Sequence, residues 1–250
     1  MLILEKVTKM MSSLQIGKLS KGKKINAILR SILFFLGIAS FGPSVYSEDW
    51  VPVYEEPKHR LVFENDHAFI LNVNLPLGYE SLSHEHKLNV LYVTISGSKV
   101  WAQPMGGNRR EVVVATGDLR FSSDNHDLPH VHKVGNIGTT PFHLIGIAIK
   151  DEVSGDVTPL EGDTSGMELA IEKSHARVYR ILLKPGEKTG LHQHNLPFAE
   201  VFMNRGTLAD ANGDAKSVQA ADFEWHEGGK SHSFENTGEE AIEIIEMQWR

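Results

Sequence analysis

A two-part motif occurs twice in this chain and constrains the possible folds more than any other feature. The segments GYESLSHEH (78–86) and GEKTGLHQH (186–194) each consist of a glycine, five further residues and His-x-His. Further along, HKVGNIG (132–138) and HSFENTG (232–238) share the spacing His-x-x-x-Asn-x-Gly. Since both parts recur in the same order, the sequence indicates an internal duplication of about a hundred residues, the size of one small domain.

The histidines of this motif have the spacing of metal ligands. In an extended strand, residues i and i+2 point to the same face, so His192 and His194 present two imidazoles side by side. His232 is the candidate for a third ligand. An isolated His-x-His more often marks two polar residues facing water, but its repetition favours a metal site. The corresponding residues of the first copy are His84, His86 and His132.

Composition narrows the kind of site and partner. The 250 residues include 13 histidines and no cysteine, which excludes disulfides, thiolate nucleophiles and cysteine-bound zinc. The net charge is −7, and because residues 1–47 hold seven basic side chains and one acidic side chain, the remainder carries −13. A body this acidic would repel nucleic acid, so we expect no nucleic-acid partner.

Residues 1–47 have the character of a secretory signal peptide. A basic run precedes the apolar segment 32–39, which is too short to span a bilayer, and small or aliphatic residues follow up to Ser47. We expect cleavage near Ser47, export to the periplasm or the medium, and a mature protein that does not lie in the membrane. The alternative is an uncleaved amphipathic or membrane-anchoring helix.

The remaining chain divides into two β-rich domains joined by a linker. Residues 48–150 and 177–250 contain short runs rich in β-branched and aromatic residues, bounded by Gly, Asn, Asp and Pro, with no sustained helical periodicity. Residues 151–176 are rich in Gly, Pro, Asp, Thr and Glu, which is typical of a surface connection. The arm at 48–60 would pack on the other domain or on a second subunit, so a homodimer is possible.

With these motifs, each half resembles a cupin domain, and the chain resembles a bicupin. The resemblance implies an all-β fold of two tandem double-stranded β-helix (jelly-roll) barrels, each holding a divalent metal between its two motifs. The cupin pattern places a glutamate four or five residues after the second histidine. In the second copy the nearest carboxylate is Glu200, one residue late, and a bulge at Pro197 would turn it inward. We therefore expect Glu200 as the fourth ligand, the alternative being a solvent-facing glutamate.

The first copy has no such carboxylate, because Val90 or Leu91 fills that position. Its three histidines would form a metal site with open positions, to which His126 or His130 would add a ligand or substitute for His132. The alternative is a vestigial domain that serves packing.

The resemblance implies a class of function without fixing the reaction. Cupin enzymes include dioxygenases, isomerases, decarboxylases and lyases, so we expect a divalent metal (Fe, Mn, Ni or Zn) that acts on a small-molecule substrate. No residue of the sequence is identified as a general base. The alternative is a non-catalytic bicupin that binds a small ligand or a metal.

Overall fold

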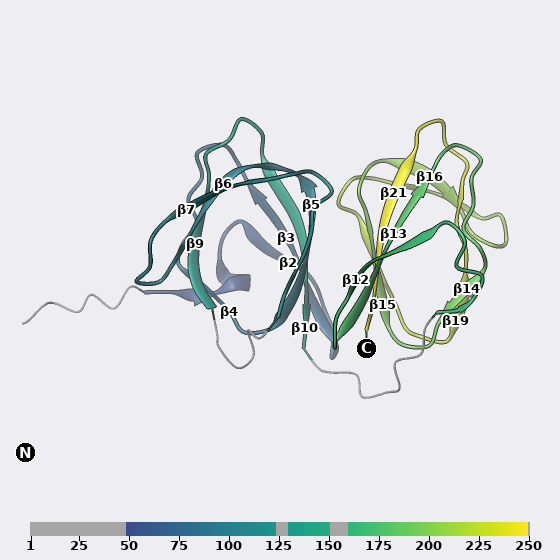
Figure 1. Cartoon of the computed structure of the whole chain (residues 1–250), viewed down its shortest axis with the longest axis horizontal. Coiled ribbons are helices and arrows are strands. Elements are labelled where there is room, and N and C mark those ends of the chain that lie inside the picture. The colour runs from purple at the N-terminus through teal and green to yellow at the C-terminus, as the bar shows by residue number, and fades with distance from the viewer. Residues whose placement is uncertain (1–48, 124–129, 151–159, 250) are drawn as a thin grey trace, which may run out of the picture. The chain divides into compact units, whose positions relative to one another are not determined.

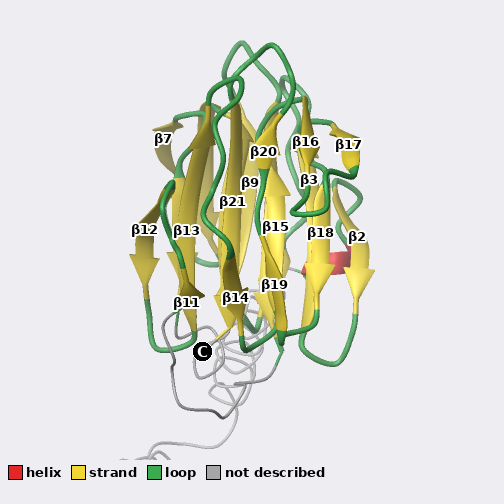
Figure 2. Ribbon diagram, turned by 90° about the vertical axis from the view of Figure 1, so that its right-hand side faces the viewer, coloured by secondary structure: helices red, strands yellow, loops and turns green. Residues whose placement is uncertain are grey.

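The computed structural model describes residues 49–123, 130–150 and 160–249. The predicted signal peptide and His126 lie outside these ranges, so cleavage and export stay predictions. Within the described ranges, no helix has the length and apolar character needed to cross a membrane. Strands dominate (yellow in Figure 2), and the single helical element of the described residues is the 3-10 helix η1 (Val53–Glu55).

The strands of residues 49–150 form the first barrel, shown in purple to teal in Figure 1. It contains two five-stranded sheets, with strand orders β1-β4-β9-β6-β7 and β2-β3-β10-β5-β8. The strands are β1 (Val51–Pro52), β2 (His59–Glu64), β3 (Ala68–Leu75), β4 (His84–His86), β5 (Asn89–Ser96), β6 (Ser98–Pro104), β7 (Arg110–Val114), β8 (Leu119–Ser122), β9 (His130–Asn136) and β10 (Phe142–Ile149).

The strands of residues 160–249 form the second barrel, shown in green to yellow in Figure 1. It contains one five-stranded sheet, β12-β13-β21-β15-β18, and two three-stranded sheets, β11-β14-β19 and β17-β16-β20. The strands are β11 (Glu161–Gly162), β12 (Met167–Glu172), β13 (Ala176–Leu183), β14 (His192–His194), β15 (Phe198–Phe202), β16 (Gly206–Ala209), β17 (Ala215–Val218), β18 (Phe223–His226), β19 (Lys230–His232), β20 (Glu235–Asn236) and β21 (Ile242–Trp249).

The fold confirms the predicted all-β class with two tandem jelly-roll barrels. Strand pairing also repeats between the barrels, because His84 lies opposite His132 just as His192 lies opposite His232. The segment 151–176, predicted as a linker, contains β11 and β12, which pair with β14 and β13 of the second barrel. The arm at 48–60 contributes β1, which pairs in parallel with β4 of its own barrel.

The last strand of each barrel is central to its sheet and almost wholly buried. Seven of the eight residues of β10 and of β21 are buried, since other strands flank them on both sides and the barrel covers their inner face. Full burial of one large aliphatic side chain contributes roughly 1.5–3 kcal/mol. Ile145, Ile147 and Ile245 belong to one cluster of buried residues drawn from both barrels. A charged residue inside such a strand is therefore costly unless it has a partner.

The first glycine of each motif is needed for its backbone conformation. Gly78 and Gly186 have φ angles of 75° and 80°, in the left-handed region that side-chain-bearing residues rarely adopt. The turn at each position leads the chain from β3 or β13 towards the His-x-His strand. These glycines explain why both copies of the motif begin with the same residue.

Candidate metal centre

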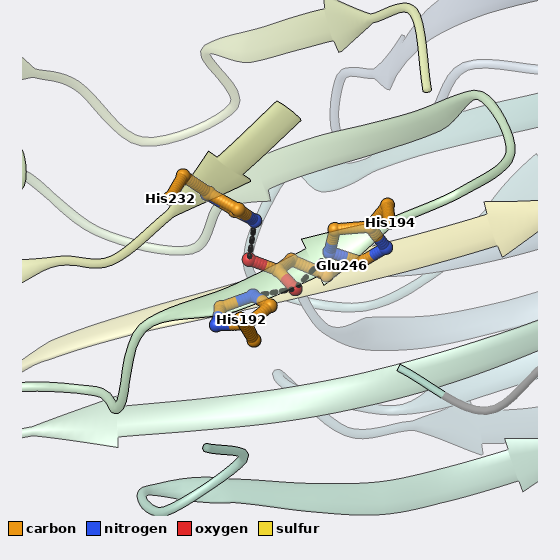
Figure 3. Close-up of side chains that lie close together, drawn as sticks. All are labelled: His192, His194, His232 and Glu246. Atoms are coloured by element: carbon orange, nitrogen blue, oxygen red, sulfur yellow. Dashed lines mark hydrogen bonds and ion pairs between the residues drawn. The ribbon is translucent and has the colours of Figure 1, made fainter. Parts of the chain in front are cut away.

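The second barrel brings three histidines and one glutamate to a common point (Figure 3). His192 and His194 come from β14, His232 from β19, and Glu246 from β21. One ligating atom from each of the four side chains lies within 4.8 Å of the others. His194 and Glu246 are 0 % exposed and His192 is 1 % exposed, so the group lies inside the barrel.

The carboxylate of Glu246 lies among the imidazoles. Its Oε2 atom is 3.2 Å from Nε2 of His194 and 3.5 Å from Nε2 of His192, and its Oε1 atom is 3.7 Å from Nε2 of His232. Behind this group, Nδ1 of His192 donates to the carbonyl of Gly190 at 3.1 Å, and Nδ1 of His194 donates to Oε1 of Gln248 at 2.9 Å. These outer hydrogen bonds fix the two rings with their Nε2 atoms turned towards the Glu246 carboxylate.

The inner atoms of this group fit a bound cation. Nε2 of His192, Nε2 of His232 and Oε1 of Glu246 are buried and have no hydrogen-bond partner among the described residues. Each buried polar atom left unpaired costs about 1–3 kcal/mol. A divalent ion between three nitrogens and one carboxylate would satisfy all three atoms, and neutral imidazole with carboxylate suits Fe, Mn, Ni or Zn.

The protonation states also suit metal ligands. Burial lowers the pKa of His232 to about 3, so its imidazole is neutral at pH 7. Burial acts to raise the pKa of Glu246, but the neighbouring His192 and His194 outweigh it and lower that pKa to about 2. For His192 burial acts to lower the pKa, and Glu246 reverses the direction and raises it. A cation would replace the proton that Glu246 favours on His192.

Glu200, predicted as the fourth ligand, lies beside this group and not within it. Its Oε1 atom is 3.2 Å from Nε2 of His226 and 3.5 Å from Nδ1 of His232. Burial raises the pKa of Glu200, and the charge of Glu246 raises it further, although His226 opposes this shift. The position next to the three histidines is taken by Glu246, which faces the same side as Glu200 because β15 and β21 pair these two residues directly.

Phe198 fills one of the two places where the cupin pattern expects the glutamate, and Ala199 fills the other. The phenylalanine packs against the histidine group. Its ring stacks on His194 with a centroid distance of 3.8 Å and holds that imidazole from the side. The sequence did carry a signal for Glu246. Glu243 and Glu246 are three residues apart in a strand, so they face opposite sides, and one of them must point into the barrel.

The first barrel brings together His84, His86 and His132, whose ligating atoms also lie within 4.8 Å of one another. Nε2 of His84 is 2.9 Å from Nε2 of His132, while Nδ1 of His84 donates to the carbonyl of Leu82 at 2.9 Å. Two nitrogens bound at about 2.0–2.1 Å and at right angles to one another would be about 3 Å apart, so this spacing fits a shared ion.

Burial keeps the three imidazoles of the first barrel neutral. It lowers the pKa of His84 to about 4 and the pKa values of His86 and His132 well below their usual value. His130, predicted as a possible extra ligand, lies outside the group, with its Nε2 atom 3.1 Å from Nδ1 of His132. The hydroxyl of Tyr92 lies 3.3 Å from Nδ1 of His86.

Comparison with known proteins assigns the family. No family model matches the chain. The oxalate-binding protein of Thermotoga maritima is 32% identical over 106 residues, which cover 37% of this chain and 87% of that protein. The matched length is about that of one of the two barrels. The chain belongs to the cupin superfamily.

Solved structures agree with the cupin fold. AerE from Microcystis aeruginosa superposes with a TM-score of 0.56 at 12% identity, covering 74% of this chain and 88% of that chain. The oxalate decarboxylase of Lactobacillus farciminis, in a formate complex, gives a TM-score of 0.53 at 14% identity, with coverages of 74% and 77%. At such low identity, these likenesses show the fold alone.

Two residues of this cupin's arm, Glu56 and His59, adjoin the first histidine group and carried no sequence signal. The ring of His59 lies 4.4 Å from the ring of His84, and its Nδ1 atom is 2.5 Å from Oε2 of Glu56. Glu56 also accepts hydrogen bonds from the Tyr79 hydroxyl and the Lys58 backbone N–H, both at 2.7 Å. Burial acts to raise the pKa of Glu56, but these partners lower it to about 2.

Proposed function

We propose that this cupin binds divalent metal in both barrels, through His192, His194, His232 and Glu246 in the second and through His84, His86 and His132 in the first, and uses bound metal to recognise a small dicarboxylate of the oxalate class. The observation that carries the metal is the convergence of buried atoms, among which Nε2 of His192, Nε2 of His232 and Oε1 of Glu246 have no hydrogen-bond partner in the described part of the chain. Four protein ligands leave two positions of an octahedral ion for a ligand.

The ligand class is supported by the relative. The protein from Thermotoga maritima is named for binding oxalate, and this chain matches most of its length. Oxalate can bind a metal through two carboxylate oxygens, as open coordination positions allow. The predicted signal peptide extends the proposal to a protein that meets this ligand outside the cytoplasm, and cell fractionation with an antibody against the mature chain tests that part.

The decisive experiment measures metal and oxalate binding on the same samples. The protein is stripped with a chelator, reloaded with Mn²⁺ and titrated with oxalate by calorimetry. We expect oxalate to bind only the reloaded protein. His194→Ala and Glu246→Gln should each remove one equivalent of Mn²⁺, whereas Glu239→Gln, at an exposed position before β21, should bind as the wild type does. Undiminished metal in both site variants would reject the proposed centre.

The choice between a binding protein and an enzyme needs a separate measurement. Metal-dependent dioxygenases, isomerases, decarboxylases and lyases occur among cupins, and the second barrel places Glu200 and His226 beside the proposed metal. Oxalate is incubated with the reloaded protein in air, and the oxalate that remains is determined over time. A constant concentration assigns a binding function, and a decrease that needs the metal assigns an enzyme.

A further inference from the structure

A row of three glutamates crosses the sheet of the second barrel. Strand pairing places Glu200 of β15 directly opposite Glu246 of β21 on one side and opposite Glu224 of β18 on the other. Directly paired residues of neighbouring strands project to the same face with Cβ atoms about 4.5–5.5 Å apart. Three carboxylates at this spacing repel one another unless positive charge lies between them.

Positive partners are present at the ends of this row. Glu246 lies among the three histidines of the proposed metal centre, and Glu224 is held by Nζ of Lys216 at 2.5 Å. The middle carboxylate differs. Glu200 is 1 % exposed, and neither of its oxygens has a hydrogen-bond partner among the described residues. The nearest nitrogens, on His226 and His232, are at 3.2 and 3.5 Å without hydrogen-bond geometry.

We propose that Glu200, Glu224 and His226 bind a second divalent cation beside the first. Ligating atoms of these three side chains lie within 4.8 Å of one another, and Nε2 of His226 is itself buried and without a hydrogen-bond partner among the described residues. One imidazole nitrogen and two carboxylates form a donor set that suits zinc or manganese.

The second site is more open to solvent than the first and has a lysine beside it. The side chains of His226 and Glu224 are 32% and 38% exposed, which gives a cation a route from solvent and leaves room for water ligands. Lys216 faces the same group, and its positive charge opposes a cation, so the second site binds more weakly than the first.

His232 separates the two cations. Its Nε2 atom faces Oε1 of Glu246 at 3.7 Å, and its Nδ1 atom faces Oε1 of Glu200 at 3.5 Å. The second barrel therefore holds a pair of neighbouring ions with one imidazole ring between them. This inference goes beyond the proposed function, which needs no ion at Glu200, Glu224 and His226.

The test counts ions at equilibrium. Stripped protein is dialysed against a series of Mn²⁺ concentrations, and bound Mn²⁺ per chain is determined by elemental analysis. We expect Glu200→Gln, and likewise Glu224→Gln, to bind one Mn²⁺ fewer than the wild type at saturation. Glu239→Gln is the matched control and should bind the wild-type number. Circular dichroism and thermal melting check that each variant is folded, and Glu224, being partly exposed, is the substitution that disturbs the core least.

A double variant separates this inference from the proposed function. If the sites are distinct, His194→Ala combined with Glu224→Gln loses two ions where each single variant loses one. If the double variant loses only one, the residues share a single site and the second cation is rejected. Wild-type binding by both Glu200→Gln and Glu224→Gln would also reject it and would leave Glu200 as a protonated buried carboxyl group. The proposed centre fails separately, when His194→Ala loses no ion.

Discussion

At the scale of single residues, Glu56 supports the first histidine group from outside. Its carboxylate accepts hydrogen bonds from the Tyr79 hydroxyl and the Lys58 backbone N–H and lies against His59, whose ring packs on His84. Such outer partners fix the orientation of the rings that they contact. The Glu56 side chain is buried, so the loss of its charge weakens its hydrogen bonds with the Tyr79 hydroxyl and the Lys58 backbone N–H.

We expect Glu56→Gln to destabilise the metal-free protein by about 2 kcal/mol at pH 7, because hydrogen bonds to a charged acceptor are lost. The pKa of Glu56 is about 2 in the fold and 4.5 ordinarily, so its stabilising effect is complete above pH 4.5 and is lost as the pH falls towards 2. Urea unfolding from pH 7 to pH 3 should show the difference from wild type shrinking. The exposed neighbour Glu55→Gln is the control. A difference independent of pH would contradict this role.

The sequence predicted the site residues that lie within the repeated motif and missed those that other segments bring to it. The six motif histidines meet in two groups because each pair lies on a short strand and faces the third across one strand pairing. Glu246 and His59 come from segments that the motif does not include. The spacing of Glu243 and Glu246 shows only that one of them faces the barrel interior. Which residue meets the histidines depends on the register between β15 and β21 and, for His59, on the path of the arm, and local spacing fixes neither.

At the scale of elements, the asparagine of each motif anchors a turn through its side-chain amide. Nδ2 of Asn236 donates to the carbonyls of Leu183 and Glu240 at 2.9 and 2.8 Å, and its Oδ1 atom accepts from the Gly238 N–H at 2.9 Å. Asn136 makes the equivalent bonds in the first barrel. In both barrels the asparagine lies four residues after the third histidine and bonds to the last residue of β3 or β13. It therefore holds the segment that carries the third histidine against the end of that strand.

We expect Asn236→Ala to lower the free energy of unfolding by about 3 kcal/mol, since three buried hydrogen bonds are lost and their backbone partners stay buried. Chemical denaturation measures this change. Asn212→Ala, at an exposed turn, should change stability by less than about 0.5 kcal/mol. Equal effects at the two positions would show that the asparagine of the motif does not anchor the turn.

At the scale of the whole molecule, the two barrels share a fold but differ in charge around their histidines. Strand register aligns Glu200 with Tyr92, because these residues lie opposite Glu246 and Gly146 respectively. Arg120, opposite Tyr92, takes the place of Glu224. Gly146, Tyr92 and Arg120 of the first barrel thus stand where the second barrel has Glu246, Glu200 and Glu224. The positive charge of Arg120 contributes to lowering the pKa of His86, although burial is the larger cause. The two barrels therefore share their strand arrangement and differ in the sign of the charge beside their histidines.

This difference predicts where a dianion binds. A metal on three neutral histidines near Arg120 keeps its full positive charge, whereas the glutamates of the second barrel repel oxalate. We expect His84→Ala with His86→Ala to abolish oxalate binding, Arg120→Gln to weaken it about tenfold, and His194→Ala to leave it within about twofold of wild type. Calorimetry on Mn²⁺-loaded variants measures all three. Loss of binding in His194→Ala alone would place the ligand in the second barrel.

The position of Glu246 on β21 also sets when the second site becomes complete during synthesis. The ribosome adds residues from the N-terminus, so His84, His86 and His132 emerge before any ligand of the second barrel. His192, His194 and His232 follow, and Glu246 comes after all of them. A nascent chain can therefore close its first histidine group while the second group still lacks its carboxylate.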